Sequence, residues 1–102
     1  MTAELAARLA VYRIELISEA KEFTLVAREK CFALLRIAEG SVSGVGSSGM
    51  MTEQGLAYLV WRGGEPRLVA KGSDVAAGAE EVEAIRKFAE DLKEALSGRR
   101  EY

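Results

Sequence analysis

The stretch LAYLVWRGGEPRLVAK, residues 56–71, decides the fold that the sequence predicts. Two runs rich in strand-forming residues, Leu56–Arg62 and Pro66–Lys71, flank Gly63-Gly64, which is typical of a tight hairpin turn. If Arg62 pairs with Glu65, the register divides the hairpin into two faces. We expect one face to be core: Ala57, Leu59, Trp61, Leu68 and Ala70. We expect the other to be a half-exposed basic and aromatic surface: Tyr58, Val60, Arg62, Arg67, Val69 and Lys71.

The segment that follows the hairpin, residues 73–98, predicts a helix. Ser73 and Asp74 are placed to cap its start and Gly98 to end it, and the glutamates at 80, 81 and 83 suit a helix that begins near Ala79. Apolar residues with spacings of three and four form a coiled-coil seam: Val82, Ile85, Ala89, Leu92 and Leu96. We expect self-association through this zipper-like helix, although a helix packed on its own sheet gives the same pattern.

The N-terminal residues 1–39 contain neither Gly nor Pro, and their apolar residues recur with helical spacings. We expect helices here, with a break near Ser18, with Thr2 and Ser18 as caps and with Gly40 at the end. Cys31 falls on the apolar stripe and is expected to act as a small buried hydrophobe. An alternative makes Ala10–Ile17 a strand, because its side chains alternate and favour strands.

The predicted fold class is therefore α+β: a small antiparallel sheet built around the 56–71 hairpin, packed by N-terminal helices and a C-terminal zipper-like helix. The 102 residues make one domain, with a core over residues 1–72 and an oligomerisation helix over 73–98. One Cys provides no disulfide framework, so we expect burial between subunits to add stability. The lone Cys and the absence of a long apolar run predict a cytoplasmic protein without a membrane span.

Several kinds of chemistry are disfavoured by the residues that are missing. The absence of His removes the usual general base and the commonest zinc ligand, and a single Cys cannot fill a metal site. The S-x-x-K match from Ser18 to Lys21 lacks the further motifs that such nucleophiles need. The G-x-G-x-x-G match over Gly44–Gly49 is followed by no helix of a dinucleotide fold, so we expect a mobile Ser/Gly loop or a short edge strand around Val42 and Val45. We expect no enzyme, cofactor or metal; a nucleotide enzyme at the glycine loop is the minor alternative.

Charge is distributed unevenly along the chain. The net charge is −2, but residues 73–98 carry −4 and residues 1–72 carry +1, so the hairpin face is locally positive. Single-stranded nucleic acid is bound by basic grooves with aromatic stacking platforms. The residues that could supply such a surface are Tyr58, Arg62, Arg67 and Lys71, with Trp61 either in the core or as a further platform. The glycine loop could offer backbone amides to phosphates.

The layout of this hairpin followed by the Val82–Leu96 zipper resembles the ThermoDBP-related proteins of thermophilic archaea. The absence of Asn and the presence of one Gln fit a thermophile, although a GC-rich genome would give part of the same bias. The resemblance implies an oligomeric protein that binds single-stranded DNA or RNA with little sequence specificity and assembles through its C-terminal segment. The alternative function is a protein–protein adaptor that uses the same face or the N-terminal stripe.

Overall fold

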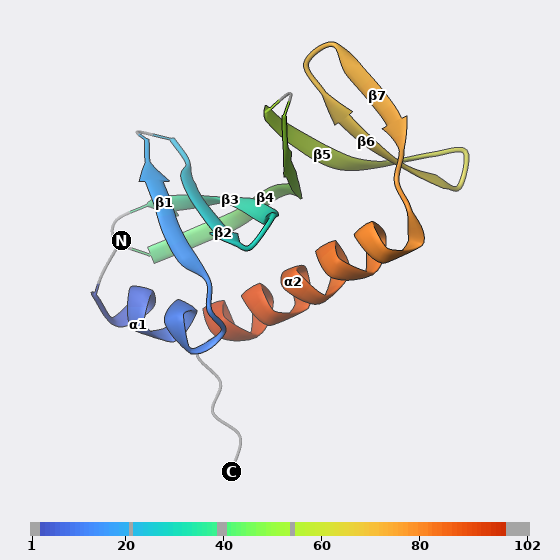
Figure 1. The fold of residues 1–102 in the computed structure, drawn as a ribbon. Coiled ribbons are helices and arrows are strands. Elements are labelled where there is room, and N and C mark those ends of the chain that lie inside the picture. The colour runs from blue at the N-terminus through green and yellow to red at the C-terminus, as the bar shows by residue number, and fades with distance from the viewer. Residues whose placement is uncertain (1–2, 21, 39–40, 54, 98–102) are drawn as a thin grey trace.

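The computed structural model describes residues 3–20, 22–38, 41–53 and 55–97 (Figure 1). Within them the chain forms two helices and seven strands, in the order α1 (Ala3–Val11), β1 (Glu15–Glu19), β2 (Thr24–Arg28), β3 (Cys31–Ala38), β4 (Ser41–Thr52), β5 (Gly55–Arg62), β6 (Glu65–Ala70), β7 (Ser73–Ala76) and α2 (Ala79–Ser97). The strands form one antiparallel sheet in which each strand pairs with its neighbour in sequence. The α+β class is confirmed.

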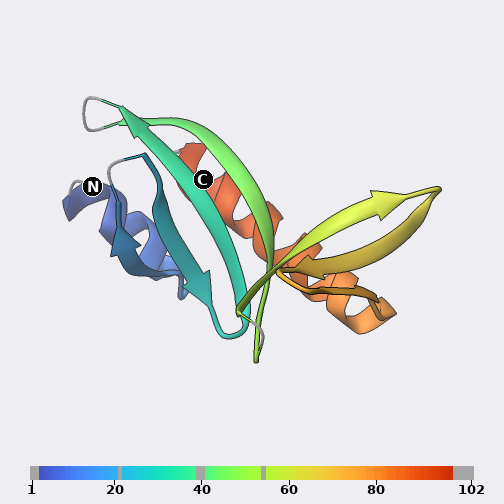
Figure 2. The ribbon, with the colours of Figure 1, turned by 90° about the horizontal axis from the view of Figure 1, so that it is seen from above.

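Both helices lie on the same side of the sheet, which we call the helix side, and the opposite surface of the sheet is called the open face (Figures 1 and 2). Alternate residues of β3, namely Cys31, Ala33 and Leu35, belong to the buried cluster between sheet and helices. The helices contribute Leu5, Leu9, Ile85, Phe88 and Leu92 to the same cluster. Because side chains alternate along a strand, Phe32, Leu34 and Arg36 point to the open face.

The 56–71 hairpin forms with the predicted register, since Arg62 pairs with Glu65. Ala57 and Leu68 are buried, and Leu59 and Ala70 pack against the core from half-buried positions. Trp61 is not a core residue: it lies on the same side as Leu59, but its exposed fraction is 59%. The turn of the β5–β6 hairpin extends past the helices (Figure 2).

The prediction of helix from Ser18 to residue 39 is wrong, because this segment forms β1, β2 and β3. Ser18 and Cys31 lie in strands, although Cys31 is buried as expected. The alternative strand over Ala10–Ile17 is correct only for its last three residues, since α1 extends to Val11 and β1 begins at Glu15. Residues of β2 and β3 are buried on both faces of the sheet, which hides the alternation that would have revealed strands. Thr2, Lys21, Gly40 and Gly98 lie outside the described residues.

The C-terminal helix α2 begins at Ala79, as its glutamates predict, and Ser73 and Asp74 are not its caps because they form β7. Gly78 occupies the capping position: its carbonyl accepts a hydrogen bond from the Val82 N–H at 3.0 Å. The Glu81 carboxylate accepts one from the Gly78 N–H at 2.8 Å. In the described part of the chain, neither helix combines the length and the apolar content that a membrane crossing needs.

Candidate nucleic-acid interface

The G-x-G-x-x-G segment lies in β4, the central strand of the sheet, so the predictions of a mobile loop and of a short edge strand are both wrong. Gly44 pairs with Arg36, and Gly49 pairs with Phe32 on one side and Tyr58 on the other, which places these glycines on the open face. A Cβ atom at Gly49 would lie 1.9 Å from the Ala57 carbonyl oxygen, and one at Gly46 would lie 3.2 Å from the Leu34 carbonyl oxygen. We call the positions 44, 46 and 49 the glycine strip.

Two aromatic rings meet across the glycine strip. Phe32 from β3 and Tyr58 from β5 are each paired with Gly49, and their ring centroids are 5.3 Å apart with planes at 77°. A side chain at Gly49 would occupy the space between the strands that carry them. Phe32 is fully buried, whereas Tyr58 is half-buried and keeps part of its surface on the open face.

A second aromatic group stands on the other side of the strip. The guanidinium carbon of Arg36 lies 5.5 Å from the centroid of the Phe23 ring, which is a cation–π geometry. The pair borders a hollow of about 240 Å³ whose remaining lining is Ser43, Gly44, Val45 and Gly46. Arg36 is exposed and makes no ion pair with a described residue, so its charge faces solvent beside a flat ring.

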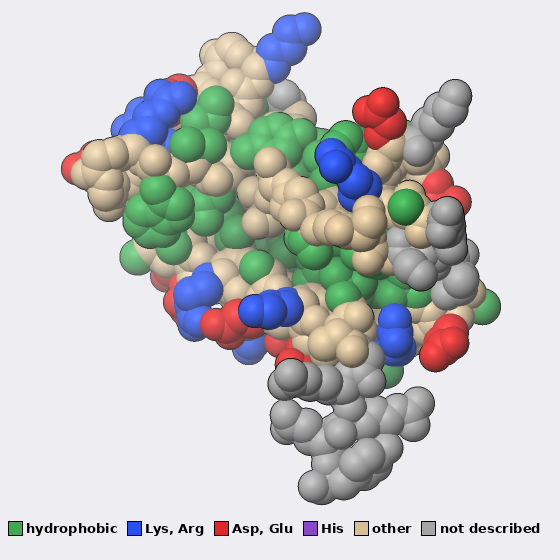
Figure 3. Space-filling model, turned by 180° about the vertical axis from the view of Figure 1, so that it is seen from behind, with side chains coloured by type: hydrophobic (Ala, Val, Ile, Leu, Met, Phe, Trp, Pro, Cys, Tyr) green, Lys and Arg blue, Asp and Glu red, His purple; other side chains and the backbone are tan. Residues whose placement is uncertain are grey.

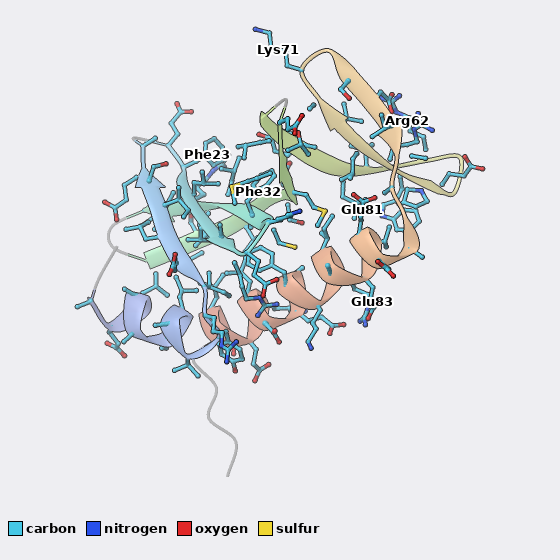
Figure 4. The ribbon with its side chains drawn as sticks, viewed as in Figure 1. Phe23, Phe32, Arg62, Lys71, Glu81 and Glu83 are labelled. Atoms are coloured by element: carbon cyan, nitrogen blue, oxygen red, sulfur yellow. The ribbon has the colours of Figure 1, made fainter. Side chains whose placement is uncertain are left out.

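The residues predicted to bind nucleic acid are only partly brought together. Tyr58, Arg62 and Arg67 share the open face, because the register pairs Val60 with Arg67 and places Tyr58 and Arg62 two residues to either side of Val60. Trp61 points to the opposite side of the same strand. Lys71 lies in the turn between β6 and β7, at a distance from Arg62 (Figure 4).

An acidic side chain lies between the two hairpin arginines. The Asp74 carboxylate is 2.5 Å from Arg62 Nη1 and 2.9 Å from Arg67 Nε, and Arg67 Nη2 donates to the Asp74 carbonyl at 3.1 Å. The hydrogen bond from Arg67, together with the nearby Arg62 charge, lowers the pKa of Asp74. The hairpin end of the open face is therefore close to neutral, since Glu65 also lies opposite Arg62.

Asp74, Phe23 and Arg36 are the residues of the candidate interface that the sequence did not reveal. Asp74 was interpreted as a helix cap, and the other two fell within the segment predicted as helix. The signal that could have found Arg36 is its spacing from Phe32 and Leu34, which is alternate along a strand.

The seam predicted for oligomerisation is partly used within the chain. Ile85 and Leu92 are each 1% exposed and pack in the helix-side core. Val82 and Leu96 are half-buried, and Ala89 is exposed. Self-association through α2 stays a prediction, and it would have to use the outer edge of this seam.

Among the described residues, no group of three or more His, Cys, Asp or Glu side chains is arranged so that it could hold a metal ion. Burial raises the pKa of the Cys31 thiol. The Arg28 charge lowers this pKa and the Glu29 charge raises it further, and the net shift is upward.

In comparisons with known proteins, no family model, no curated protein and no solved structure matches the chain.

Proposed function

We propose that the chain binds single-stranded nucleic acid across the open face of its sheet, with little sequence specificity. The observation that carries the proposal is the glycine strip of β4, bordered by the Phe23–Arg36 pair on one side and by Tyr58 on the other, with Arg67 further along the hairpin on the same face. At Gly44 and Gly46 the open face carries no side chain, which allows a flexible polymer to approach the backbone closely there.

The chemistry of the two borders suits such a ligand. The Phe23 ring, the Tyr58 ring and the guanidinium plane of Arg36 offer surfaces on which bases stack regardless of sequence. Arg36 and Arg67 offer charged N–H donors to phosphates, because guanidinium groups match phosphate geometry. The resemblance to ThermoDBP-related proteins points to the same class of ligand, now with Phe23 and Arg36 added to the hairpin residues.

The two borders lie on parts of the sheet that separate. β4 pairs with β5 only over Gly49–Thr52 and Gly55–Tyr58, and beyond these pairs the β5–β6 hairpin diverges from β3 and β4 (Figure 2). A ligand that contacts both Arg36 and Arg67 must therefore be a flexible polymer long enough to bridge the two parts. Shorter oligonucleotides would reach one border only.

Charge-reversal variants test the proposal by fluorescence anisotropy with labelled single-stranded DNA and RNA at low and moderate salt. Arg36→Glu and Arg67→Glu should each weaken binding about tenfold or more, because each replaces a phosphate contact by repulsion. Lys30→Glu is the matched control, since Lys30 is exposed in the β2–β3 turn, away from the open face. Equal effects from all three variants would contradict a site on this face.

A protein–protein adaptor is the second candidate, and a separate observation favours it. All of β1 is exposed at the edge of the sheet, and its Leu16 and Ile17 side chains are 44% and 50% exposed. Such an edge can accept a partner's strand. Seen from behind, hydrophobic side chains are spread over the middle of the molecule, with both basic and acidic side chains around them (Figure 3). Salt distinguishes the candidates, since phosphate binding weakens steeply as salt rises and apolar docking does not.

A further inference from the structure

A hollow of about 410 Å³ lies on the helix side, away from the open face. Its walls come from the end of α1, the β2–β3 turn, the start of β3 and the middle of α2. Its charged lining consists of Arg13, Arg28, Glu29, Lys87 and Asp91. The volume falls within the range of small-molecule sites, and the lining combines a few charged groups with apolar side chains such as Val11 and Ala84.

Two strained backbone positions border this hollow. Among the described residues, Arg13 and Glu29 are the non-glycine residues with positive φ, at 63° and 54°. At the other positive-φ positions the chain uses glycine: Gly55, Gly63, Gly64 and Gly72. Left-handed backbone costs about 1–2 kcal/mol for a residue with a Cβ atom. Non-glycine residues held in this conformation cluster at binding sites, so both positions point to this hollow.

Arg13 occupies a position where glycine is the usual residue. The Arg13 N–H donates to the Ala10 carbonyl at 2.9 Å, and the Ile14 N–H donates to the Leu9 carbonyl at 3.0 Å. These two bonds define a Schellman motif with Arg13 at the left-handed C′ position, and buried Ile14 and Leu9 supply its hydrophobic contact. Glycine at position 13 would make the end of the helix more stable than arginine does. The stability of the helix end therefore does not explain why this position carries an arginine side chain.

The charges in the hollow are not all used within the chain. Arg28 Nη1 donates to Asp91 at 2.8 Å and to the Tyr12 carbonyl at 3.1 Å, and its guanidinium carbon lies 5.5 Å from the Phe88 ring centroid. This clamp joins β2, α1 and α2 and neutralises Asp91. The side chains of Arg13 and Lys87 make no hydrogen bond or ion pair with a described residue, and Glu29 is the remaining carboxylate.

We propose that this hollow binds a small organic anion, with its carboxylate or phosphate group between Arg13 and Lys87 and its apolar part against Val11 and Ala84. Two cationic side chains without an ion pair or hydrogen bond to a described residue line the hollow together with one such carboxylate, Glu29, and this balance favours an anionic ligand. The site is independent of the proposed function, because it lies on the other side of the sheet.

The test is an amide NMR titration of the full chain with phenyl phosphate and, separately, benzoate, with sodium chloride at equal ionic strength as the reference. Saturable shifts at residues 11–13, 28–31 and 84–91 are expected, and the stronger of the two ligands identifies the anionic group. Shifts that do not saturate, or that chloride reproduces, would overturn the proposal. Shifts confined to the open face would also overturn it and would assign anion binding to the nucleic-acid interface instead.

Variants separate binding from folding. Arg13→Gly should raise the melting temperature, because glycine relieves the left-handed strain, and should still weaken binding about tenfold by removing a charge-assisted contact. Lys87→Ala should weaken binding similarly, whereas Lys30→Ala, an exposed neighbour outside the lining, should not. If Arg13→Gly and Lys87→Ala bind the ligand as tightly as the unmodified chain, the site is not the one proposed.

Discussion

Asp74→Asn removes a negative charge that lies between Arg62 and Arg67 on the open face. In the folded chain the carboxylate occupies donors that a phosphate would need, so Asp74 competes with the ligand for both guanidinium groups. A phosphate bound to either arginine would lie about 6 Å from the Asp74 carboxylate. At this distance, repulsion between the two negative charges in a water-like dielectric weakens binding roughly threefold without salt. Screening reduces this effect to roughly twofold at about 0.1 M salt. Asp74→Asn should therefore tighten single-strand binding by at least about twofold.

The salt dependence of the variant provides a second measure. Each additional phosphate contact on a single strand steepens the slope of log K against log salt by about 0.7. If Asp74→Asn frees one arginine for the ligand, anisotropy titrations at several salt concentrations should show this steeper slope. Glu83→Gln is the matched control, because Glu83 pairs with Arg86 on α2, away from the open face. An unchanged or lower affinity of Asp74→Asn would refute the assignment of Arg62 and Arg67 to the interface.

Three further predictions concern stability and assembly. Gly49→Ala should lower the free energy of unfolding, measured by urea denaturation, by about 1–3 kcal/mol or more, because its Cβ would overlap the Ala57 carbonyl. Gly44→Ala should lower the free energy of unfolding by less than about 1 kcal/mol, because a Cβ at Gly44 would meet open space. Leu92→Ala should lower the free energy of unfolding by about 2–5 kcal/mol, because Leu92 is buried in the chain's own core. Ala89→Glu should leave the stability unchanged and should lower any self-association seen by sedimentation velocity. Oligomers that persist in Ala89→Glu would exclude the α2 seam as the contact. The lowered pKa of Asp74 means that its ion pairs stabilise the fold fully above the ordinary carboxyl pKa of about 3.9, and that this stabilisation is lost as the pH falls through the lowered pKa. The melting temperatures of the unmodified chain and of Asp74→Asn should therefore converge in acid. A difference that stays constant with pH would contradict this.

The parts of the fold that could be predicted are those with local signals. Gly63-Gly64 and the alternation around it fixed the hairpin and its register, and the glutamates after Gly78 marked the start of α2. The strands β2 and β3 could not be recognised, because apolar residues such as Ala27 and Phe32 are buried on the open face while Val26 and Ala33 are buried on the helix side. Apolar residues on both faces remove the period of two that identifies a strand.

The turns contributed to the same error. The β2–β3 turn has Glu29 and Lys30 at its centre, with Glu29 at positive φ, where Asn, Asp or Gly would be the usual residue. The side chains of the candidate interface were consequently predicted only on the hairpin, with the glycine segment expected to add backbone amides from a loop. The shared face of Tyr58, Arg62 and Arg67 could be predicted because the hairpin register was predicted correctly. The position of Arg36 on this face could not be predicted, because it depends on β3, a strand that was not expected.

Binding of single-stranded nucleic acid to the open face can be mapped directly by following amide NMR shifts during titration with a single-stranded oligonucleotide at low salt. We expect shifts along β3, β4, β5 and β6, including Arg36, Gly44 and Tyr58, with little change in α1 and α2. An absence of shifts at stoichiometric oligonucleotide, or shifts confined to the helix side, would contradict it.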